Sequence, residues 1–231
     1  YVCGAPATIT PTTCKQGHYC DAGSVRAVAC PGGTWSNLTG LGGAASCRNA
    51  TPGFLAPAGS TEQTPCYPGT VQPRAGMGAC DRCEAGKFQK NEAKIVCEPC
   101  TPGSFCPEGA SAALPCKEGS YSISTNLTTD AECTPTAKGH YAPTGSTTQT
   151  ACSPGTVAPN ASMAKCVKCA AGTYQAGEGE QACVACERGT YCPEGSSAAL
   201  PCEKGTYSNA TNLTSTDQCT ACPMGSWCSA G

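Results

Sequence analysis

The cysteines of this sequence constrain its fold more than any other feature. The chain of 231 residues contains 23 cysteines, together with 28 glycines and 19 prolines. Leu, Ile, Val and Phe account for only 21 residues, about 9% of the chain. Chains that fold around an apolar core typically have roughly 20% of these residues. Charged residues are 13% and the formal net charge is −2, which does not favour disorder by self-repulsion. A large apolar core is therefore excluded, and the cysteines must hold the chain together.

Cysteines at this density form either a disulfide framework or a set of structural zinc sites. The asparagines distinguish the two, because six of the seven open an Asn-x-Ser/Thr sequon. We predict N-glycans on these six: Asn37, Asn49, Asn126, Asn160, Asn209 and Asn212. Only two histidines are available as further zinc ligands. The secretory route is therefore favoured, with disulfides, an extracellular or cell-surface location, and no metal or other cofactor.

Several classes of partner are disfavoured by the sequence. It contains no run of 18 apolar residues and does not open with a hydrophobic segment, so we predict neither a membrane span nor a signal peptide within it. The net charge is near zero and no basic cluster occurs, so nucleic acid is not an expected partner. The sequence does not begin with Met, and we expect a segment of a longer protein.

The cysteines recur with a period of 86 residues. A repeat of this kind indicates an array of similar units. We predict a first repeat over residues 14–99, a second over 100–185 and a partial third over 186–231. Residues 1–13 are then a linker or an inserted junction.

A finer pattern runs inside this period: a glycine, any residue, then an aromatic or large aliphatic residue. The thirteen glycines, which we call the repeat glycines, are Gly17, Gly33, Gly53, Gly69, Gly86, Gly103, Gly119, Gly139, Gly155, Gly172, Gly189, Gly205 and Gly225. We expect each to take a positive φ in a turn, with the bulky residue packed on a neighbouring disulfide. The intervals of 16 to 20 residues leave room for one short hairpin each. The predicted fold class is a small disulfide-rich, mostly β or irregular chain: a linear array of about thirteen 16–20-residue hairpin units forming an extended rod, with little or no helix.

Cysteines that are absent together from a unit favour one scheme of disulfide pairing. Where Cys100 and Cys106 stand in one unit, another has Thr136 and Ala142, which indicates that this pair is bonded to itself. Extending this gives eleven sequential bonds: Cys14 with Cys20, Cys30 with Cys47, Cys66 with Cys80, Cys83 with Cys97, Cys100 with Cys106, Cys116 with Cys133, Cys152 with Cys166, Cys169 with Cys183, Cys186 with Cys192, Cys202 with Cys219, and Cys222 with Cys228. A crossed scheme, Cys100 with Cys116 and Cys106 with Cys133, remains open on the sequence alone. Cys3 is the orphan, with its expected partner upstream of Tyr1.

No motif in the sequence indicates catalysis. The five Cys-x-x-Cys pairs recur with the repeat and are not expected at helix N-termini, so we interpret them as junctions between disulfide loops and not as redox sites. His18 and His140 both occupy the variable position after a repeat glycine, where we expect an exposed side chain with no specific role. We therefore predict no enzyme activity, no catalytic residues and no metal ligands.

Two strings carry a resemblance to a known family: CTPGSFCPEGASAALPCKEGSYS and CERGTYCPEGSSAALPCEKGTYS. They resemble the ephrin-receptor-like cysteine-rich repeats, which are similar in style to EGF-like and tumour-necrosis-factor-receptor modules. The resemblance implies extracellular, disulfide-bonded β modules in long arrays. Such arrays occur in receptor ectodomains and in large surface proteins of algae and protists, including proteins similar to flagellar mastigoneme subunits.

Three functions are compatible with these observations. The leading hypothesis is a structural extracellular glycoprotein, a stalk, coat or filament subunit, whose partners are copies of itself or other extracellular structural proteins. The alternative is a receptor or adhesin ectodomain that binds a protein or glycan, for which the region from Lys87 to Lys94 is the one locally distinctive segment. A third is a spacer attached to a secreted enzyme.

Overall fold

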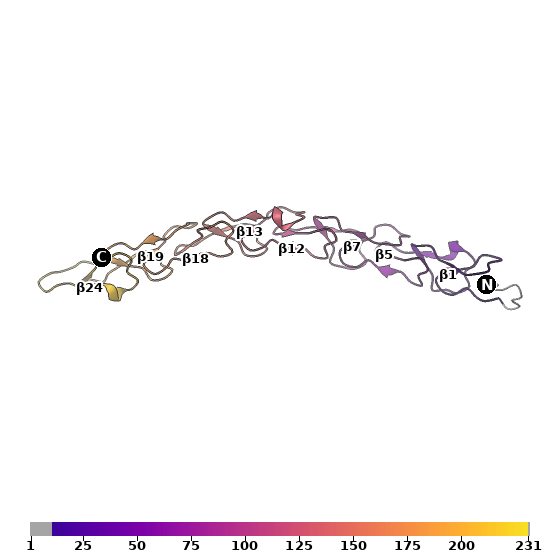
Figure 1. Ribbon diagram of the computed structural model, residues 1–231, viewed down its shortest axis with the longest axis horizontal. Helices are drawn as coiled ribbons and strands as arrows, with labels where there is room; N and C mark the ends of the chain where they lie inside the picture. Colours follow the sequence, from indigo (N-terminus) through magenta and orange to yellow (C-terminus); the bar gives the residue numbers. More distant parts are fainter. Residues whose placement is uncertain (1–10, 231) are drawn as a thin grey trace. The chain divides into compact units, whose positions relative to one another are not determined.

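The computed structural model describes residues 11–230, and these form hairpins that follow one another along the chain (Figure 1). Twelve separate two-stranded sheets are present, each made of consecutive strands of two residues. The described residues contain no α-helix, only three short 3-10 turns. The predicted fold class, a series of small disulfide-rich hairpins with little or no helix, is confirmed.

The strands pair in sequence order. The first six sheets are β1 (His18–Tyr19) with β2 (Val28–Ala29), β3 (Thr34–Trp35) with β4 (Arg48–Asn49), β5 (Phe54–Leu55) with β6 (Thr64–Pro65), β7 (Thr70–Val71) with β8 (Asp81–Arg82), β9 (Lys87–Phe88) with β10 (Glu98–Pro99), and β11 (Ser104–Phe105) with β12 (Leu114–Pro115). The remaining six are β13 (Ser120–Tyr121) with β14 (Thr134–Pro135), β15 (His140–Tyr141) with β16 (Thr150–Ala151), β17 (Thr156–Val157) with β18 (Val167–Lys168), β19 (Thr173–Tyr174) with β20 (Val184–Ala185), β21 (Thr190–Tyr191) with β22 (Leu200–Pro201), and β23 (Thr206–Tyr207) with β24 (Thr220–Ala221). The 3-10 turns are η1 (Ala44–Ser46), η2 (Asp130–Glu132) and η3 (Thr216–Gln218). Each 3-10 turn directly precedes the cysteine that ends one of the longest disulfide loops.

Contacts divide the chain into two compact units. Of the described residues, the first unit contains 11–101, 105–114 and 125–129, and the second contains 102–104, 115–124 and 130–230. Hairpins of the same kind make up both units.

Each hairpin is entered through its repeat glycine. All thirteen of these glycines have φ between 70° and 90°, so the predicted positive-φ turn is confirmed. This region is unfavourable for residues with a Cβ, which explains why glycine is retained. The carbonyl of Gly139, for example, accepts a hydrogen bond of 2.9 Å from the N–H of Cys152 at the end of its own hairpin.

Hydrogen bonds also join each hairpin to the next one. The N–H of Gly139 donates to the carbonyl of Ala158 at 2.8 Å, and the N–H of Gly155 donates to Gln175 at 2.7 Å. In the first unit, Gly53 donates in the same way to Gln72. Successive hairpins are therefore linked by the backbone as well as by the chain itself.

Each hairpin has a second turn residue, and from the third hairpin on this residue contacts the hairpin two places earlier. These residues lie six or seven positions after the repeat glycine and also have positive φ: Gly23, Gly40, Gly59, Gly76, Ala93, Gly109, Asn126, Gly145, Ser162, Gly179, Gly195 and Asn212. The N–H of Gly195 donates to the carbonyl of Cys169 at 2.8 Å, and its own carbonyl lies directly against Gly155, where a Cβ would overlap it. The repeat predicts contacts mainly between neighbours, and the structure adds this contact between alternate hairpins.

Buried cysteines replace the apolar core. The eleven disulfides of the described residues follow the sequential scheme, with Cα–Cα distances of 5.7–6.2 Å, and each lies within a single unit: ten in hairpins and one, Cys222 with Cys228, in the final turn. The crossed alternative is not what the structure contains. Tyr19 packs against the cluster of Cys30, Leu41 and Cys47, and Phe88 packs against that of Cys100, Cys106 and Ala110, as expected for aromatics on neighbouring disulfides. Cys3 lies outside the described residues.

The last of the thirteen expected units differs from the rest. Gly225 keeps its positive φ and Cys222 is bonded to Cys228, but the described residues from 225 to 230 contain no strand. Trp227, which occupies the position of the half-buried aromatics, is 87% exposed. Twelve hairpins and one turn thus stand where the sequence predicts about thirteen hairpins.

Candidate functional site

Hairpin closure is the feature that varies most from unit to unit. The chain closes its units in one of three ways, two of which use a disulfide from the residue three before the repeat glycine. Four units use a short disulfide across the glycine turn, as Cys100 and Cys106 do. Seven use a longer disulfide that reaches the start of the second strand, as Cys152 and Cys166 do. The remaining two contain no cysteine.

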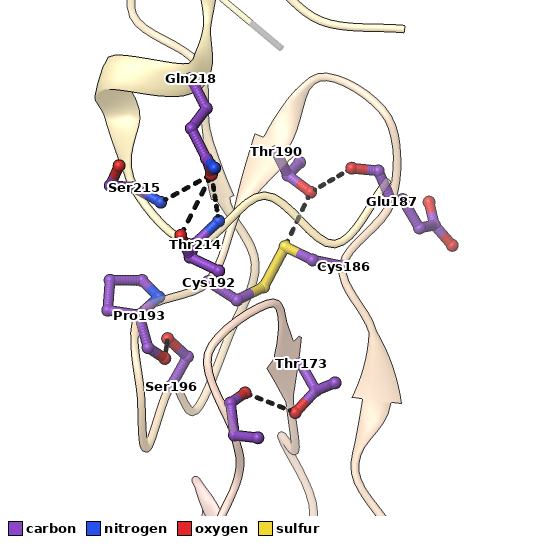
Figure 2. Close-up of a disulfide and its surroundings, with 11 residues drawn as sticks. Thr173, Cys186, Glu187, Thr190, Cys192, Pro193, Ser196, Thr214, Ser215 and Gln218 are labelled. Atoms are coloured by element: carbon purple, nitrogen blue, oxygen red, sulfur yellow. Dashed lines mark hydrogen bonds between the residues drawn. A yellow bond between two sulfur atoms is a disulfide. The ribbon is translucent and has the colours of Figure 1, made fainter. Parts of the chain in front are cut away.

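Figure 2 shows one of the short disulfides, between Cys186 and Cys192. The hydroxyl of Thr190 lies 3.2 Å from the sulfur of Cys186 and donates to the carbonyl of Glu187 at 2.7 Å. Both cysteines are fully buried. The polar contact and the burial fix the disulfide inside the turn, which is a structural environment and not that of an exposed redox pair.

A glutamine closes the two hairpins that lack cysteine. Gln63 and Gln149 stand immediately before the second strand, the position of Cys166 in a disulfide-closed hairpin. The side-chain oxygen of Gln149 accepts a hydrogen bond of 2.8 Å from the N–H of Ala137. Gln63 accepts in the same way from the N–H of Thr51 at 2.9 Å. In these two hairpins the glutamine hydrogen bond therefore closes the base at the position where other hairpins have a disulfide.

Three buried glutamines organise the loops of other hairpins, although no sequence motif predicts them. Gln72, Gln89 and Gln175 lie three residues after a repeat glycine and are almost fully buried. The Gln175 amide nitrogen donates to the carbonyl of Ala182 at 2.7 Å, and its oxygen accepts from the N–H of Gly177 at 2.9 Å. Their recurrence at one register position is the signal that could identify them.

We expect Gln175→Leu to loosen its hairpin by about 1–3 kcal/mol, because two backbone groups lose their buried partner. Native-state hydrogen exchange at the N–H of Gly177, which bonds the Gln175 oxygen, measures the change. Gln181→Leu is the matched control, because Gln181 belongs to the same hairpin and is exposed. Equal exchange at Gly177 in the two variants would contradict this role for Gln175.

The six sequon asparagines are all exposed in the structure. Asn126 and Asn212 are second turn residues, with φ of 62° and 60°, and Asn49 lies in β4 opposite Thr34. Five of the six fall inside disulfide loops, and Asn209 and Asn212 share the loop between Cys202 and Cys219. Their exposure is compatible with the predicted glycans, which remain a prediction.

The distinctive region from Lys87 to Lys94 borders a shallow groove of about 250 Å³. Its lining includes Val71, Pro73, Asp81, Arg82, Glu84, Lys87, Ile95, Val96 and Cys97. Ile95 and Val96 are 52% and 65% exposed, and Lys87 pairs with Glu84 at 3.0 Å. One period later, Ile95 and Val96 correspond to Gln181 and Ala182, so this mixture of apolar and charged groups is not repeated there.

The remaining candidates from the sequence are the Cys-x-x-Cys pairs and the two histidines. Every Cys-x-x-Cys pair joins two different disulfides; Cys80, for example, bonds Cys66 while Cys83 bonds Cys97. His18 and His140 are half-buried, and each ring places its Nδ1 within 3.2 Å of the carbonyl two residues earlier. Within residues 11–230, no group of three or more His, Cys, Asp or Glu side chains is arranged to hold a metal ion.

One carboxyl has a shifted pKa. The side chain of Lys117 hydrogen bonds to Asp130 at 3.1 Å and lowers its pKa, and a bond from the backbone N–H of Lys117 acts in the same direction. Because the folded-state pKa is lowered, the contribution of this pair to stability is present above the ordinary pKa of aspartate and is lost as the pH falls. The pair lies at the surface and fixes η2 to the start of its loop, which is a structural role.

Comparison with known proteins leaves the family open. No family model matches the chain, and no curated protein matches it either. The described residues include no helix with the length and apolar character needed to cross a bilayer. What the structure establishes is a cysteine-rich array of small disulfide-bonded hairpins, and its eleven disulfides indicate an oxidising, extracellular setting.

Proposed function

We propose that this chain is a structural segment of an extracellular glycoprotein, serving as part of a stalk, coat or filament, and that it is not an enzyme. The observation that carries the proposal is the range of its contacts: hairpins bond to the next hairpin and to the next but one. An array held by such local contacts lengthens as units are added. Closure of single hairpins by disulfides or glutamines gives each unit its own stability.

Two further features support a structural role. The kind of hairpin closure recurs at the same positions of the 86-residue period in the first two repeats, and the partial third repeat differs only where Cys222 and Cys228 bond in place of a cysteine-free closure. The six exposed sequons would cover the surface with N-glycans, which add bulk and solubility. The resemblance to ephrin-receptor-like repeats agrees with this setting, and a mastigoneme-like filament is one form that it could take.

A receptor or adhesin ectodomain is the second candidate, and one observation favours it. The groove beside Ile95 and Val96 combines exposed apolar side chains with the Lys87–Glu84 ion pair. Apolar groups surrounded by charges are common at sites of protein contact. In this reading the two neighbouring hairpins that line the groove, β7–β8 and β9–β10, bind the partner, and the other hairpins position them.

Small-angle X-ray scattering tests the structural proposal. The maximum dimension of the chain is compared with that of a variant in which residues 100–185 are duplicated. If the array lengthens with repeat number, 86 added residues increase the maximum dimension by about 37%. A compact particle would grow by only about 13%, and that result would overturn the proposal. The unchanged chain, measured in the same buffer at several concentrations, is the control for association.

Electron microscopy of the native material then separates the two candidates. A regular fibre with glycan protrusions supports the filament or coat. Dispersed single chains that bind a partner, with binding lost in Ile95→Ser, favour the receptor or adhesin.

A further inference from the structure

The six sequons fall into two structural classes, divided by the residue between the asparagine and the hydroxyl residue. In the sequons of Asn49, Asn126 and Asn212 this middle residue is buried: Ala50 is 0% exposed, Leu127 8% and Leu213 7%. In those of Asn37, Asn160 and Asn209 it is exposed: Leu38, Ala161 and Ala210. All six asparagine side chains are exposed, so exposure of the asparagine alone does not separate them.

The sequon of Asn212 is held by hairpins that precede it in the chain. The N–H of Asn212 donates to the carbonyl of Cys186 at 2.8 Å, and the N–H of Cys192 donates to the carbonyl of Leu213 at 2.8 Å. Leu213 also forms a parallel bridge with Tyr191. Because these partners are synthesised earlier, they are available as soon as the sequon itself has been made.

The hydroxyl of this sequon is also engaged. Figure 2 shows the side-chain oxygen of Gln218 accepting from the N–H and the hydroxyl of Thr214, at 2.6 and 3.1 Å, and from the N–H of Ser215. Gln218 belongs to η3, which directly precedes Cys219. In the folded loop, both the backbone and the hydroxyl of the sequon are therefore engaged in hydrogen bonds.

The other members of this class are held in equivalent ways. The N–H of Asn126 donates to the carbonyl of Cys100 at 3.0 Å, and the carbonyl of Leu127 accepts from Cys106 at 2.8 Å. For Asn49, the N–H of Ala50 donates to Gly33, and the hydroxyl of Thr51 donates to Gln63 at 3.2 Å. Backbone hydrogen bonds alone do not define the class, because Ser162 of the Asn160 sequon also donates its N–H to the carbonyl of Thr136 at 3.0 Å. The difference lies in the exposure of the side chains, and Asn209, Ala210 and Thr211 are all exposed.

Transfer of an N-glycan needs access to more than the asparagine. In the reaction, the amide nitrogen forms a bond to the anomeric carbon of a lipid-linked oligosaccharide diphosphate. The bond from that carbon to the diphosphate breaks, the lipid diphosphate leaves, and the amide loses a proton to a base. Because the Ser or Thr hydroxyl is part of the acceptor motif, the enzyme must reach the asparagine and the hydroxyl together. A sequon whose middle residue is buried cannot present both without unfolding its loop.

We propose that Asn49, Asn126 and Asn212 accept a glycan only before their hairpins fold, whereas Asn37, Asn160 and Asn209 accept one before or after folding. The inference rests on the proposed secretory route. Occupancy at the first three sites is then set by competition between glycan transfer and hairpin closure. Once attached, their glycans are compatible with the fold, because the asparagine side chains remain exposed.

In vitro transfer to the full chain tests this proposal. The unglycosylated chain is presented to a purified oligosaccharyltransferase with a lipid-linked oligosaccharide, once folded and oxidised and once reduced and alkylated. Glycan occupancy at each asparagine is measured by mass spectrometry. For each site, the occupancy in the folded chain is divided by the occupancy in the reduced chain to give a folded-to-reduced ratio. We expect the ratio at Asn212 to be at least ten-fold lower than at Asn209, with Asn49 and Asn126 behaving like Asn212.

Asn209 and Asn212 form an internal control, since they share one disulfide loop. Equal ratios at these two sites would overturn the proposal. Leu213→Ser provides a second measurement: it removes the buried side chain while keeping the sequon, and should raise the Asn212 ratio with Asn209 unchanged. If the native protein proves to be unglycosylated, the proposed function fails, but these ratios still decide the structural inference.

Discussion

Gly155→Ala is expected to cost about 2–5 kcal/mol of local stability. Two causes add. Gly155 has φ of 83°, a conformation that costs residues with a Cβ roughly 1–2 kcal/mol. The added Cβ would also overlap the carbonyl oxygen of Gly195, two hairpins further on, and crowding of a packed site costs about 1–3 kcal/mol. Only a backbone shift in one of the two hairpins could relieve the overlap.

Hydrogen exchange at the hairpin-closing amide measures the effect. In the Gly155 hairpin this amide belongs to Cys169, which donates to the carbonyl of Gly155 at 2.9 Å. A loss of about 2 kcal/mol corresponds to roughly 30-fold faster exchange when exchange follows local opening. The amide of Gly195 should accelerate as well, because its bond to Cys169 depends on the same contact.

Gly205→Ala is the matched control for this substitution. Gly205 has nearly the same φ, 85°, but nothing lies within 4 Å of the position that its Cβ would take. Only the conformational cost of roughly 1–2 kcal/mol is therefore expected, read at the amide of Cys222, which donates to the Gly205 carbonyl. Similar acceleration in both variants would mean that the contact between alternate hairpins adds nothing.

The sequence predicts what is local in this fold. The repeat glycine, the second strand and the disulfide of a hairpin all lie within about one interval, so Cys152, Gly155 and Cys166 can be assigned from their register. The glycine turn and the half-buried aromatic follow from elementary properties of these residues. Local order of this kind leaves a periodic pattern that can be recognised without a structure.

The contacts between alternate hairpins leave no such pattern. Gly155 meets Gly195 through backbone atoms only, so the second turn position accepts Gly, Ala, Ser or Asn. Asn212 is recognisable from the sequence only as a sequon, although asparagine is also among the residues that best tolerate its left-handed conformation. Gln149 can be recognised from the sequence, since it occupies the register position of a bonded cysteine. Its hydrogen-bond partner cannot be predicted, because a glutamine side chain can bond to many different groups.

The second large effect is expected on removing a long disulfide. Replacing both cysteines of the bond between Cys169 and Cys183 with alanine should destabilise its hairpin by about 3 kcal/mol, because the open chain regains the entropy of a loop of this length. The amide of Cys186, which donates to Gly172 at 2.9 Å, should exchange roughly 100-fold faster. The amide of Cys152, in the earlier hairpin closed by Gln149, serves as the internal reference.

A second variant asks whether glutamine can take over part of this role. Cys169→Ala with Cys183→Gln copies the closure seen in the disulfide-free hairpins, where Ala50 and Gln63 hold the equivalent positions. The new side-chain oxygen can accept from the N–H of Ala170, as Gln149 accepts from Ala137. One such hydrogen bond should recover about 1 kcal/mol, a roughly five-fold slower exchange at Cys186 than in the double alanine variant. Equal rates in the two variants would show that the glutamines fill the cysteine positions without replacing their function, and the disulfide-free hairpins would then depend on their neighbours alone.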